Sequence, residues 1–418
     1  TGQTVLEGST GNTAVTVSAS LRAASSRTIT EHYTHRVTHA NPADHFAVNA
    51  SNSIPDGSLS GSTSFNVTGD TLDEPDETIV FTMGSPSNAS AGTSTSHTVT
   101  ITDDDAAPTV SFTSTSQSVP EGNTGNTSVT VSASLSASSG RTITVPFTLS
   151  GSASNPADHD AINASISIPA GSLSGSYSFN VVGDTLDEPD ETIVFSMDSP
   201  SNASAGTTTS HTVTLSDDDA APTVSFTAAS QSVPEGNSGN TAVNVIVSLS
   251  ASSGRTVIVP FTLSGTAANP ADHDAIEGSI SIPAGSLSGS YSFNVVGDTL
   301  DEPNETLIFS MGAPSSASLG TTTSHTVTIT DDDAAPSVSF TISSQTVLEG
   351  STGNTAVSVT ASLSAVSSLS VSVPFTLSGS AANPADHDAS NGSISIPAGS
   401  TSGSYSFNVV GDTLDEPD

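Results

Sequence analysis

Five carboxylates fall within eight positions in the stretch DTLDEPDETIVF, residues 184–195, which then continues with the apolar residues typical of a strand. Carboxylate oxygens are the ligands that hard cations such as Ca²⁺ and Mg²⁺ prefer. Paired carboxylates also serve glycosidases, but here they have too many acidic neighbours, and the chain has no Trp to form a sugar platform. The stretch also lacks the glycine that an EF-hand loop needs at position six. A cation site of another kind is therefore the first hypothesis.

The same stretch returns along the chain at a constant spacing of 114 residues. It begins at Asp70, Asp184, Asp298 and Asp412, and an acidic Glu-Gly pair keeps the same spacing. A fixed period without insertions is typical of a tandem array. We expect four repeats: 1–105 without its first strand, 106–219 and 220–333 complete, and 334–418 without its last two strands. We also expect the 114-residue unit to continue beyond both ends, in a longer polymer.

The composition excludes several classes of function. The chain has 42 Asp plus Glu against five Lys plus Arg, and its formal net charge is −37. Nucleic-acid binding requires many cationic side chains on phosphates, so this charge excludes it. The absence of Cys excludes a disulfide scaffold and a thiolate metal site. No apolar run approaches the length of a membrane span, so we expect none in this segment.

Short runs in which apolar residues alternate with Ser, Thr or Asn fill each repeat. A period of two predicts half-buried antiparallel strands, and Gly, Pro, Asn and Ser separate the runs. Seven such runs in a unit of this size predict an immunoglobulin-like sandwich. The expected fold class is thus all-β, with tandem seven-stranded antiparallel sandwiches. In residues 106–219 the apolar positions are Val110, Phe112; Val129, Val131, Leu135; Ile143, Val145, Phe147, Leu149; Ile166, Ile168; Tyr177, Phe179, Val181; Ile193, Phe195, Met197; Val213 and Leu215.

This strand order gathers the acids of the repeat at one end of the sandwich. If successive strands run antiparallel, the loops after the first, third and fifth strands share one pole with the end of the seventh. Of the repeat's acids only Asp198 lies elsewhere. Charge that served solubility alone would be scattered, whereas converging carboxylates repel one another unless a cation neutralises them. Oxygen ligands without Cys favour Ca²⁺ over Mg²⁺ or Zn²⁺.

These features resemble the Calx-beta family, Ca²⁺-binding β-sandwiches of sodium/calcium exchangers and of tandem arrays in large extracellular proteins. The resemblance covers all four copies. In the second it rests on the Glu-Gly pair at Glu121, the acid of ADHD at Asp158, PAGS at Pro169, DTLDEPDET at Asp184 and the closing DDD at Asp217.

Two positions depart from the pattern of this family. His159 stands where the family usually has Tyr, and Asn304 replaces the third-repeat equivalent of Asp190. The second departure predicts that Asp190 is not an essential ligand.

The resemblance implies that Ca²⁺ is held by acids from the loop after the first strand, two further loops and the closing acidic run. Transferred to this sequence, the ligand candidates of the first repeat are Glu7, Asp44, Asp70, Glu74, Glu77, Asp103, Asp104 and Asp105. Those of the second are Glu121, Asp158, Asp184, Glu188, Glu191, Asp217, Asp218 and Asp219. Those of the third are Glu235, Asp272, Asp298, Glu302, Glu305, Asp331, Asp332 and Asp333. The fourth repeat keeps Glu349, Asp386, Asp412 and Glu416, so its set is incomplete.

Histidines and serines offer weaker alternatives. Seven His recur at two fixed places of the repeat, which indicates a structural role. In the first repeat His35 and His39 could share a strand face and bind zinc, although a surface variation is the plainer explanation. A serine nucleophile needs a positioned base and an oxyanion hole, and no such motif is visible. We therefore expect no enzyme activity, no catalytic residue and no organic cofactor.

The linkers lead to a hypothesis about function. Only Ala220, Ala221 and Pro222 separate Asp219 from the next expected strand, and Pro stiffens so short a linker. We expect a Ca²⁺-stiffened structural segment of an extracellular or cell-surface fibre, filament or adhesin stalk, in a bacterium. Its expected partners are neighbouring repeats of the same chain, with self-association into filaments. A Ca²⁺-responsive regulatory module and a non-catalytic accessory array of a surface enzyme remain alternatives. Near-identical copies favour the fibre, because a sensor needs only one or two differentiated domains.

Overall fold

A computed structural model describes residues 2–37 and 44–414 of the chain. Every regular element in those residues is a β-strand, as the alternating runs predict. Among them no helix is long and apolar enough to cross a membrane. The chain divides into two compact units, one of Thr1–Thr185 with Pro189–Asp219, the other of Leu186–Glu188 with Ala220–Asp418. Each unit is described by itself.

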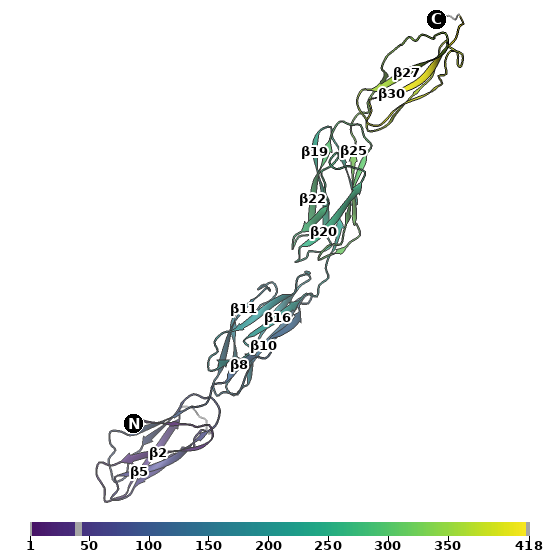
Figure 1. Ribbon diagram of the computed structural model, residues 1–418. Coiled ribbons are helices and arrows are strands. Elements are labelled where there is room, and N and C mark those ends of the chain that lie inside the picture. Colours follow the sequence, from purple (N-terminus) through teal and green to yellow (C-terminus); the bar gives the residue numbers. More distant parts are fainter. Residues whose placement is uncertain (1, 38–43, 415–418) are drawn as a thin grey trace. The chain divides into compact units, whose positions relative to one another are not determined.

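The second repeat shows the complete sandwich. One sheet has the order β13-β10-β8-β15 and the other the order β12-β11-β14-β16-β9, so the two layers are those of an immunoglobulin-like fold. Figure 1 labels four strands of this repeat, of which β8 and β10 belong to the first sheet and β11 and β16 to the second. The strands are β8 (Thr109–Phe112), β9 (Ser116–Pro120), β10 (Gly125–Leu135), β11 (Ile143–Gly151), β12 (Ala164–Ile168), β13 (Ser174–Gly183), β14 (Glu191–Met197), β15 (Ser204–Ala205) and β16 (Ser210–Ser216).

All seven predicted strands of this repeat are present, and the sequence analysis missed two more. Strand β9 follows β8 closely but joins the other sheet, where it runs parallel to β16 from Ser116↔Thr212 to Pro120↔Ser216. Its pattern SQSVP has a single large apolar residue, so alternation did not reveal it. The first repeat has the same element as β1, which runs parallel to β7. The short β15 was missed for the same reason, because its two residues are Ser and Ala.

The other repeats follow this arrangement. The first contains β1 (Gly2–Leu6), β2 (Gly11–Ser20), β3 (Ile29–Val37), β4 (Ala50–Ile54), β5 (Ser60–Gly69), β6 (Glu77–Met83) and β7 (Ser96–Thr102). The third contains β17 (Thr223–Phe226), β18 (Ser230–Pro234), β19 (Gly239–Leu249), β20 (Val257–Gly265), β21 (Gly278–Ile282), β22 (Ser288–Gly297), β23 (Glu305–Met311), β24 (Ser318–Leu319) and β25 (Ser324–Thr330). The fourth contains β26 (Val338–Phe340), β27 (Gly353–Leu363), β28 (Val371–Phe375), β29 (Gly392–Ile396) and β30 (Ser402–Gly411).

The core of each sandwich is formed by the inward positions of the alternating strands. In the second repeat Val129 on β10 lies opposite Phe179 on β13, and both are buried. Phe147 and Phe195, from the facing sheet, are fully buried with ring centroids 5.1 Å apart. Burying such side chains contributes roughly 1.5–3 kcal/mol each. This apolar core, rather than the acidic pole, therefore accounts for most of the folding free energy.

The first repeat carries a polar network inside its core. Glu31 is buried at 3% exposure, and its Oε1 accepts hydrogen bonds from the Tyr33 hydroxyl at 2.7 Å and from Asn52 Nδ2 at 3.0 Å. The corresponding residues of the second repeat are the apolar Val145 and Ile166. Burial, followed by the hydrogen bond and charge of Glu31, raises the pKa of Tyr33 above its usual range.

Candidate metal centre

Four chain segments bring acids together at one pole of the first repeat. Glu7 follows β1, Asp44 follows β3, Glu74 lies between β5 and β6, and Asp103 follows β7. Glu7, Asp44 and Glu74 each place one carboxylate oxygen within 4.8 Å of the other two, and Glu7 and Asp44 are buried. This is a distance over which one cation can be shared by several carboxylates.

The third repeat forms a corresponding group from Asp272, Glu302 and Glu305, whose oxygens also lie within 4.8 Å of one another. Asp272 corresponds to Asp44 and Glu302 to Glu74 in the 114-residue period. Glu305, the first residue of β23, completes the group and forms a side-chain hydrogen bond with Asp272. Among the described residues these two are the acidic groups of this kind.

The electrostatics of both groups show the cost of holding these charges together. Burial is the main cause that raises the pKa of Glu7 to about 8, and the charges of Asp70 and Asp44 add to it. Burial and a hydrogen bond to Asp272 raise the pKa of Glu305 to about 8. For the same reasons the pKa rises to about 7 at Glu74, Glu77 and Glu235.

Several carboxylate oxygens at the acidic poles of the first three repeats are buried without a hydrogen-bond partner. They are Glu7 Oε1 and the Oδ2 atoms of Asp105, Asp219 and Asp333. A buried polar atom without a partner costs about 1–3 kcal/mol, so native structures rarely contain one unless a ligand satisfies it. A donor set of carboxylates alone suits a hard divalent cation that accepts six to eight oxygens. The residues therefore fit Ca²⁺.

Other acids of the pole hold the loops in place. Asp104 Oδ1 accepts the backbone N–H of Gly8 at 2.9 Å, and Asp332 does the same for Gly236 at 2.9 Å. The turn at Gly8 also passes close to the end of β5, where a Cβ on Gly69 would lie 1.8 Å from the Gly8 carbonyl oxygen. Only glycine permits this contact, which brings the Glu-Gly turn beside Asp70.

The two acids of the ADHD motif have different surroundings. Asp160 accepts the backbone N–H of Asn180 at 2.6 Å and its side-chain amide at 2.8 Å. The backbone hydrogen bond, more than the other contacts, holds the pKa of Asp160 below its usual value. Asp160 therefore fixes the loop to β13. The ligand set implied by the family resemblance includes Asp158 and leaves Asp160 out, and it stays a prediction.

The remaining predicted ligands lie at the same places in their repeats. In the second repeat Glu121 follows β9, Asp158 lies between β11 and β12, and Asp217 follows β16. In the fourth repeat the N–H of Asp412 donates to Glu349 Oε1 at 3.4 Å. Glu416 lies outside the described residues, as does His39 of the zinc hypothesis. The full ligand sets therefore stay a prediction.

The recurring histidines contact the backbone. His159 Nδ1 accepts the N–H of Ala161 at 3.1 Å, and the Nδ1 atoms of His211 and His325 lie 2.8 and 2.7 Å from backbone carbonyl oxygens. These contacts agree with the predicted structural role. In the first repeat His35 Nδ1 lies 2.9 Å from Asn49 Oδ1.

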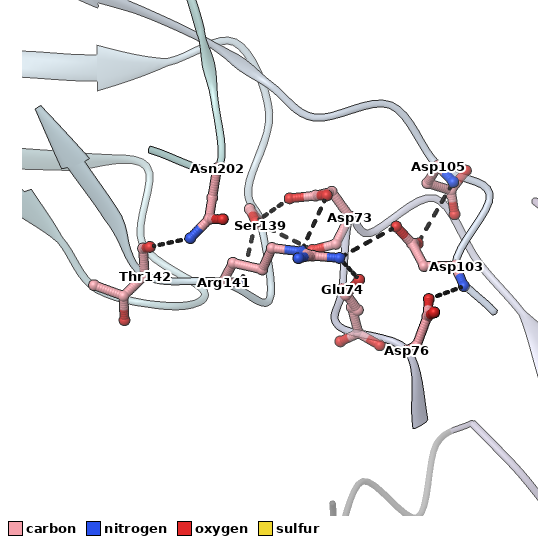
Figure 2. Close-up of polar contacts among 9 residues, drawn as sticks. All are labelled: Asp73, Glu74, Asp76, Asp103, Asp105, Ser139, Arg141, Thr142 and Asn202. Atoms are coloured by element: carbon pink, nitrogen blue, oxygen red, sulfur yellow. Dashed lines mark hydrogen bonds and ion pairs between the residues drawn. The ribbon is translucent and has the colours of Figure 1, made fainter. Parts of the chain in front are cut away.

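Sequence reasoning missed one group of residues beside the metal pole. Ser139 and Arg141, from the loop after β10, contact Asp73 and Glu74 of the preceding repeat (Figure 2). A signal for them was present, because Arg141 and Arg255, two of only five cationic residues, occupy the same position of the repeat.

The geometry defines a tandem array of β-sandwiches in which carboxylates of the kind that bind cations gather at one end of a sandwich. The Calx-beta domain model matches four consecutive segments, residues 2–105, 103–219, 217–333 and 331–418. The chain therefore belongs to the Calx-beta family, and the expected resemblance is confirmed. None of the curated proteins compared with the chain matches it.

Solved structures similar to parts of the chain include domains with the same family name. The crystal structure of CBD12 from CALX1.2 is 18% identical, with 52% of this chain and 98% of that chain covered and a TM-score of 0.26. The apo form of the Calx CBD1 domain is 22% identical, with coverages of 27% and 100% and a TM-score of 0.25. Invasin, a bacterial integrin-binding protein, is 12% identical, with coverages of 96% and 79% and a TM-score of 0.27.

Proposed function

We propose that the chain is a structural repeat segment of an extracellular or cell-surface fibre, filament or adhesin stalk, and that Ca²⁺ stiffens it. The observation that carries the proposal is the convergence of carboxylates such as Glu7, Asp44 and Glu74, together with the buried Glu7 Oε1, which has no hydrogen-bond partner. A divalent cation neutralises their repulsion, and a site of this kind binds more tightly in the folded than in the unfolded chain.

The position of the acids along the chain supports a stiffening role. Asp103–Asp105 and Asp217–Asp219 are the last residues before the linkers Ala106–Pro108 and Ala220–Pro222. A cation bound by these acids restricts the backbone conformation of the last Asp, from which each linker starts. The proline in each linker limits its flexibility further. The near-identity of the copies suits a spacer, which needs repetition rather than differentiated domains.

Two alternative functions would use the same acids. In a Ca²⁺-responsive regulatory module, Ca²⁺ binding to these acids signals the ion concentration to another domain. In an accessory array, Ca²⁺ binding orders non-catalytic domains that are attached to an enzyme. We favour the structural role because the acidic groups of the first and third repeats share two equivalent positions, Asp44 with Asp272 and Glu74 with Glu302. A differentiated sensor would place different residues there.

The test compares the full chain in chelator and in millimolar Ca²⁺. We expect the thermal midpoint to rise with Ca²⁺, and small-angle scattering to show a narrower range of conformations. Magnesium at the same concentration is the control for general screening of charge. A midpoint that stays the same in both solutions would contradict Ca²⁺ binding, and an unchanged scattering profile would contradict stiffening.

A further inference from the structure

The acidic loop of the first repeat contains one carboxylate that contacts the next repeat. Asp73 is 6% exposed, and it was not among the predicted ligands. Its Oδ2 accepts a hydrogen bond from the Ser139 hydroxyl at 2.6 Å, and its carbonyl oxygen accepts the N–H of Gly140 at 2.8 Å. Both partners belong to the next repeat (Figure 2).

Ser139 is built into this contact. It is only 1% exposed, and its hydroxyl also contacts the Asp73 carbonyl oxygen at 3.1 Å. The same Oγ accepts the N–H of Arg141 at 3.0 Å, which fixes the shape of the loop. The Asp73 carboxylate and the Ser139 hydroxyl thus satisfy each other within the protein, and no cation is needed to satisfy them.

The same contacts recur twice in the second unit. Ser253 donates to Asp187 Oδ2 at 2.6 Å, and Ser367 donates to Asp301 Oδ2 at 2.5 Å. The backbone N–H groups of Gly254 and Ser368 donate to the carbonyl oxygens of the same two aspartates, at 2.9 and 3.0 Å. The hydrogen-bond pattern therefore follows the repeated sequence and is not confined to one copy.

Arginine strengthens two of these contacts and is missing from the third. Arg141 Nε lies 3.4 Å from Asp73 Oδ1, and Arg255 Nε lies 3.5 Å from Asp187 Oδ1. Each guanidinium also donates to a backbone carbonyl oxygen, that of Glu74 or Glu188. Leu369 occupies this position in the third contact, where Ser368 Oγ adds a hydrogen bond to the Asp301 carbonyl oxygen at 3.2 Å.

We propose that Asp73, Asp187 and Asp301 are docking residues, which fasten the acidic loop of one repeat to the Ser-containing loop of the next without a metal ion. The partner that this serine loop recognises is an Asp-Glu-Pro loop, through one side-chain carboxylate and one backbone carbonyl. Docking and cation binding are then separate functions of neighbouring acids in one loop. The contact at Asp301 is the form of this contact without an arginine.

The proposal is tested in the full chain, in chelator, by spin labels at the equivalent exposed positions Ser64 and Ser178, each changed to Cys. The chain has no Cys of its own, so labelling is specific. We expect a narrow distance distribution in the parent and at least a doubling of its width in Asp73→Ala or Ser139→Ala. The matched control is Asp76→Asn, which keeps an acceptor for the N–H of Asp103 and should not change the width.

A second measurement does not depend on removing a buried group. Asp73 and Ser139 are bridge partners between parallel segments, so cysteines at both positions are close enough for a disulfide. We expect the pair to cross-link under mild oxidation in chelator, while Asp73→Cys combined with Ser25→Cys, the equivalent serine of the first repeat, should not. A broad parent distribution in chelator, or cross-linking that requires Ca²⁺, would overturn the proposal. Neither result depends on whether Ca²⁺ raises the thermal midpoint, which tests the proposed function.

Discussion

Asp190 Oδ1 accepts a hydrogen bond from the backbone N–H of Asp217 over 3.2 Å. In the third repeat the amide oxygen of Asn304 accepts the same bond from Asp331 over 3.1 Å. An oxygen acceptor is all that this position requires, and an amide supplies it as well as a carboxylate does. This explains how Asn304 can replace an acid in the middle of the acidic loop.

The first prediction contrasts two neighbouring acids of the second repeat. Asp190→Asn should leave Ca²⁺ binding nearly unchanged, because the amide keeps the hydrogen bond to Asp217. Glu191→Gln should weaken binding in this repeat by about tenfold or more, since Glu305, its equivalent in the third repeat, belongs to the acidic group there. Calorimetric titration of the full chain measures both, and we expect at least two Ca²⁺ for each complete repeat.

Ca²⁺ binding by the unmutated repeats serves as the internal control of this experiment. The first and third repeats are unchanged in both variants, so the ions that they bind, and the heat of that binding, should persist. Equal losses in Asp190→Asn and Glu191→Gln would contradict the ranking of the two acids.

The second prediction concerns pH in the absence of metal. Glu7 and Glu305 have folded-state pKa values of about 8, above the value of 4.5 for an unperturbed Glu. Between these values the folded chain binds more protons than the unfolded chain, so the free energy of unfolding falls as pH rises. The metal-free thermal midpoint should therefore decrease from about pH 5.5 to about pH 8. Saturating Ca²⁺ should abolish most of this decrease, because the ion takes the place of the protons.

Proton release on Ca²⁺ binding is a second test of the raised pKa values. Ca²⁺ added near pH 7 should displace protons from these carboxyl groups, and titrations in buffers of different ionisation enthalpy measure their number. A metal-free midpoint that rises over this pH range would refute the assignment of the raised pKa values.

The third prediction concerns the arginine beside the first metal pole. Arg141 Nη2 lies 4.0 Å from Asp103 Oδ2, a predicted ligand, so its positive charge opposes a cation there. Arg141→Leu, which copies Leu369, should tighten Ca²⁺ binding in the first repeat by roughly fivefold, the equivalent of ~1 kcal/mol. Arg27→Leu is the matched control, because Arg27 is the exposed equivalent in the first repeat. Weaker binding in Arg141→Leu would show that the arginine supports the site instead.

The fourth prediction concerns the polar network in the core of the first repeat. Glu31→Val alone leaves the buried Asn52 amide without its acceptor, and should lower the free energy of unfolding by about 1–3 kcal/mol. Glu31→Val combined with Asn52→Ile and Tyr33→Phe copies Val145, Ile166 and Phe147 of the second repeat. This triple variant should restore the stability of the parent or exceed it, because apolar replacements of a buried polar network are often neutral or stabilising. Denaturant unfolding of the full chain measures each step.

The sandwich itself could be predicted because each half-buried strand alternates visibly. Val129 and Val131, or Phe179 and Val181, indicate both the strand and the face that is buried. Strand β9 was not predicted because it lies at the edge of its sheet. It is held by backbone hydrogen bonds to β16, so it needs few apolar side chains. The pole of acids followed from connectivity alone, since antiparallel succession determines at which end each loop lies.

The separate duties of the acids could not be predicted in the same way. Asp73 and Glu74 are adjacent and chemically alike, yet one contacts Ser139 and the other belongs to the acidic group. What distinguishes them is the path of the loop and the presence of the next repeat, which a local pattern does not encode. Asp160 is similar, because only the position of Asn180 on β13 shows that it is a structural acid.

The parallel pairing of β9 with β16 has a mechanical consequence. A pull that enters at Ser116 and leaves at Ser216 acts on two strands that point the same way, so it draws them past each other. All the hydrogen bonds between Ser116↔Thr212 and Pro120↔Ser216 then bear the load together instead of opening one after another. Strands β1 with β7, and β18 with β25, are paired in the same direction. Each of these repeats is therefore built to resist shear along the direction in which tension travels through the chain.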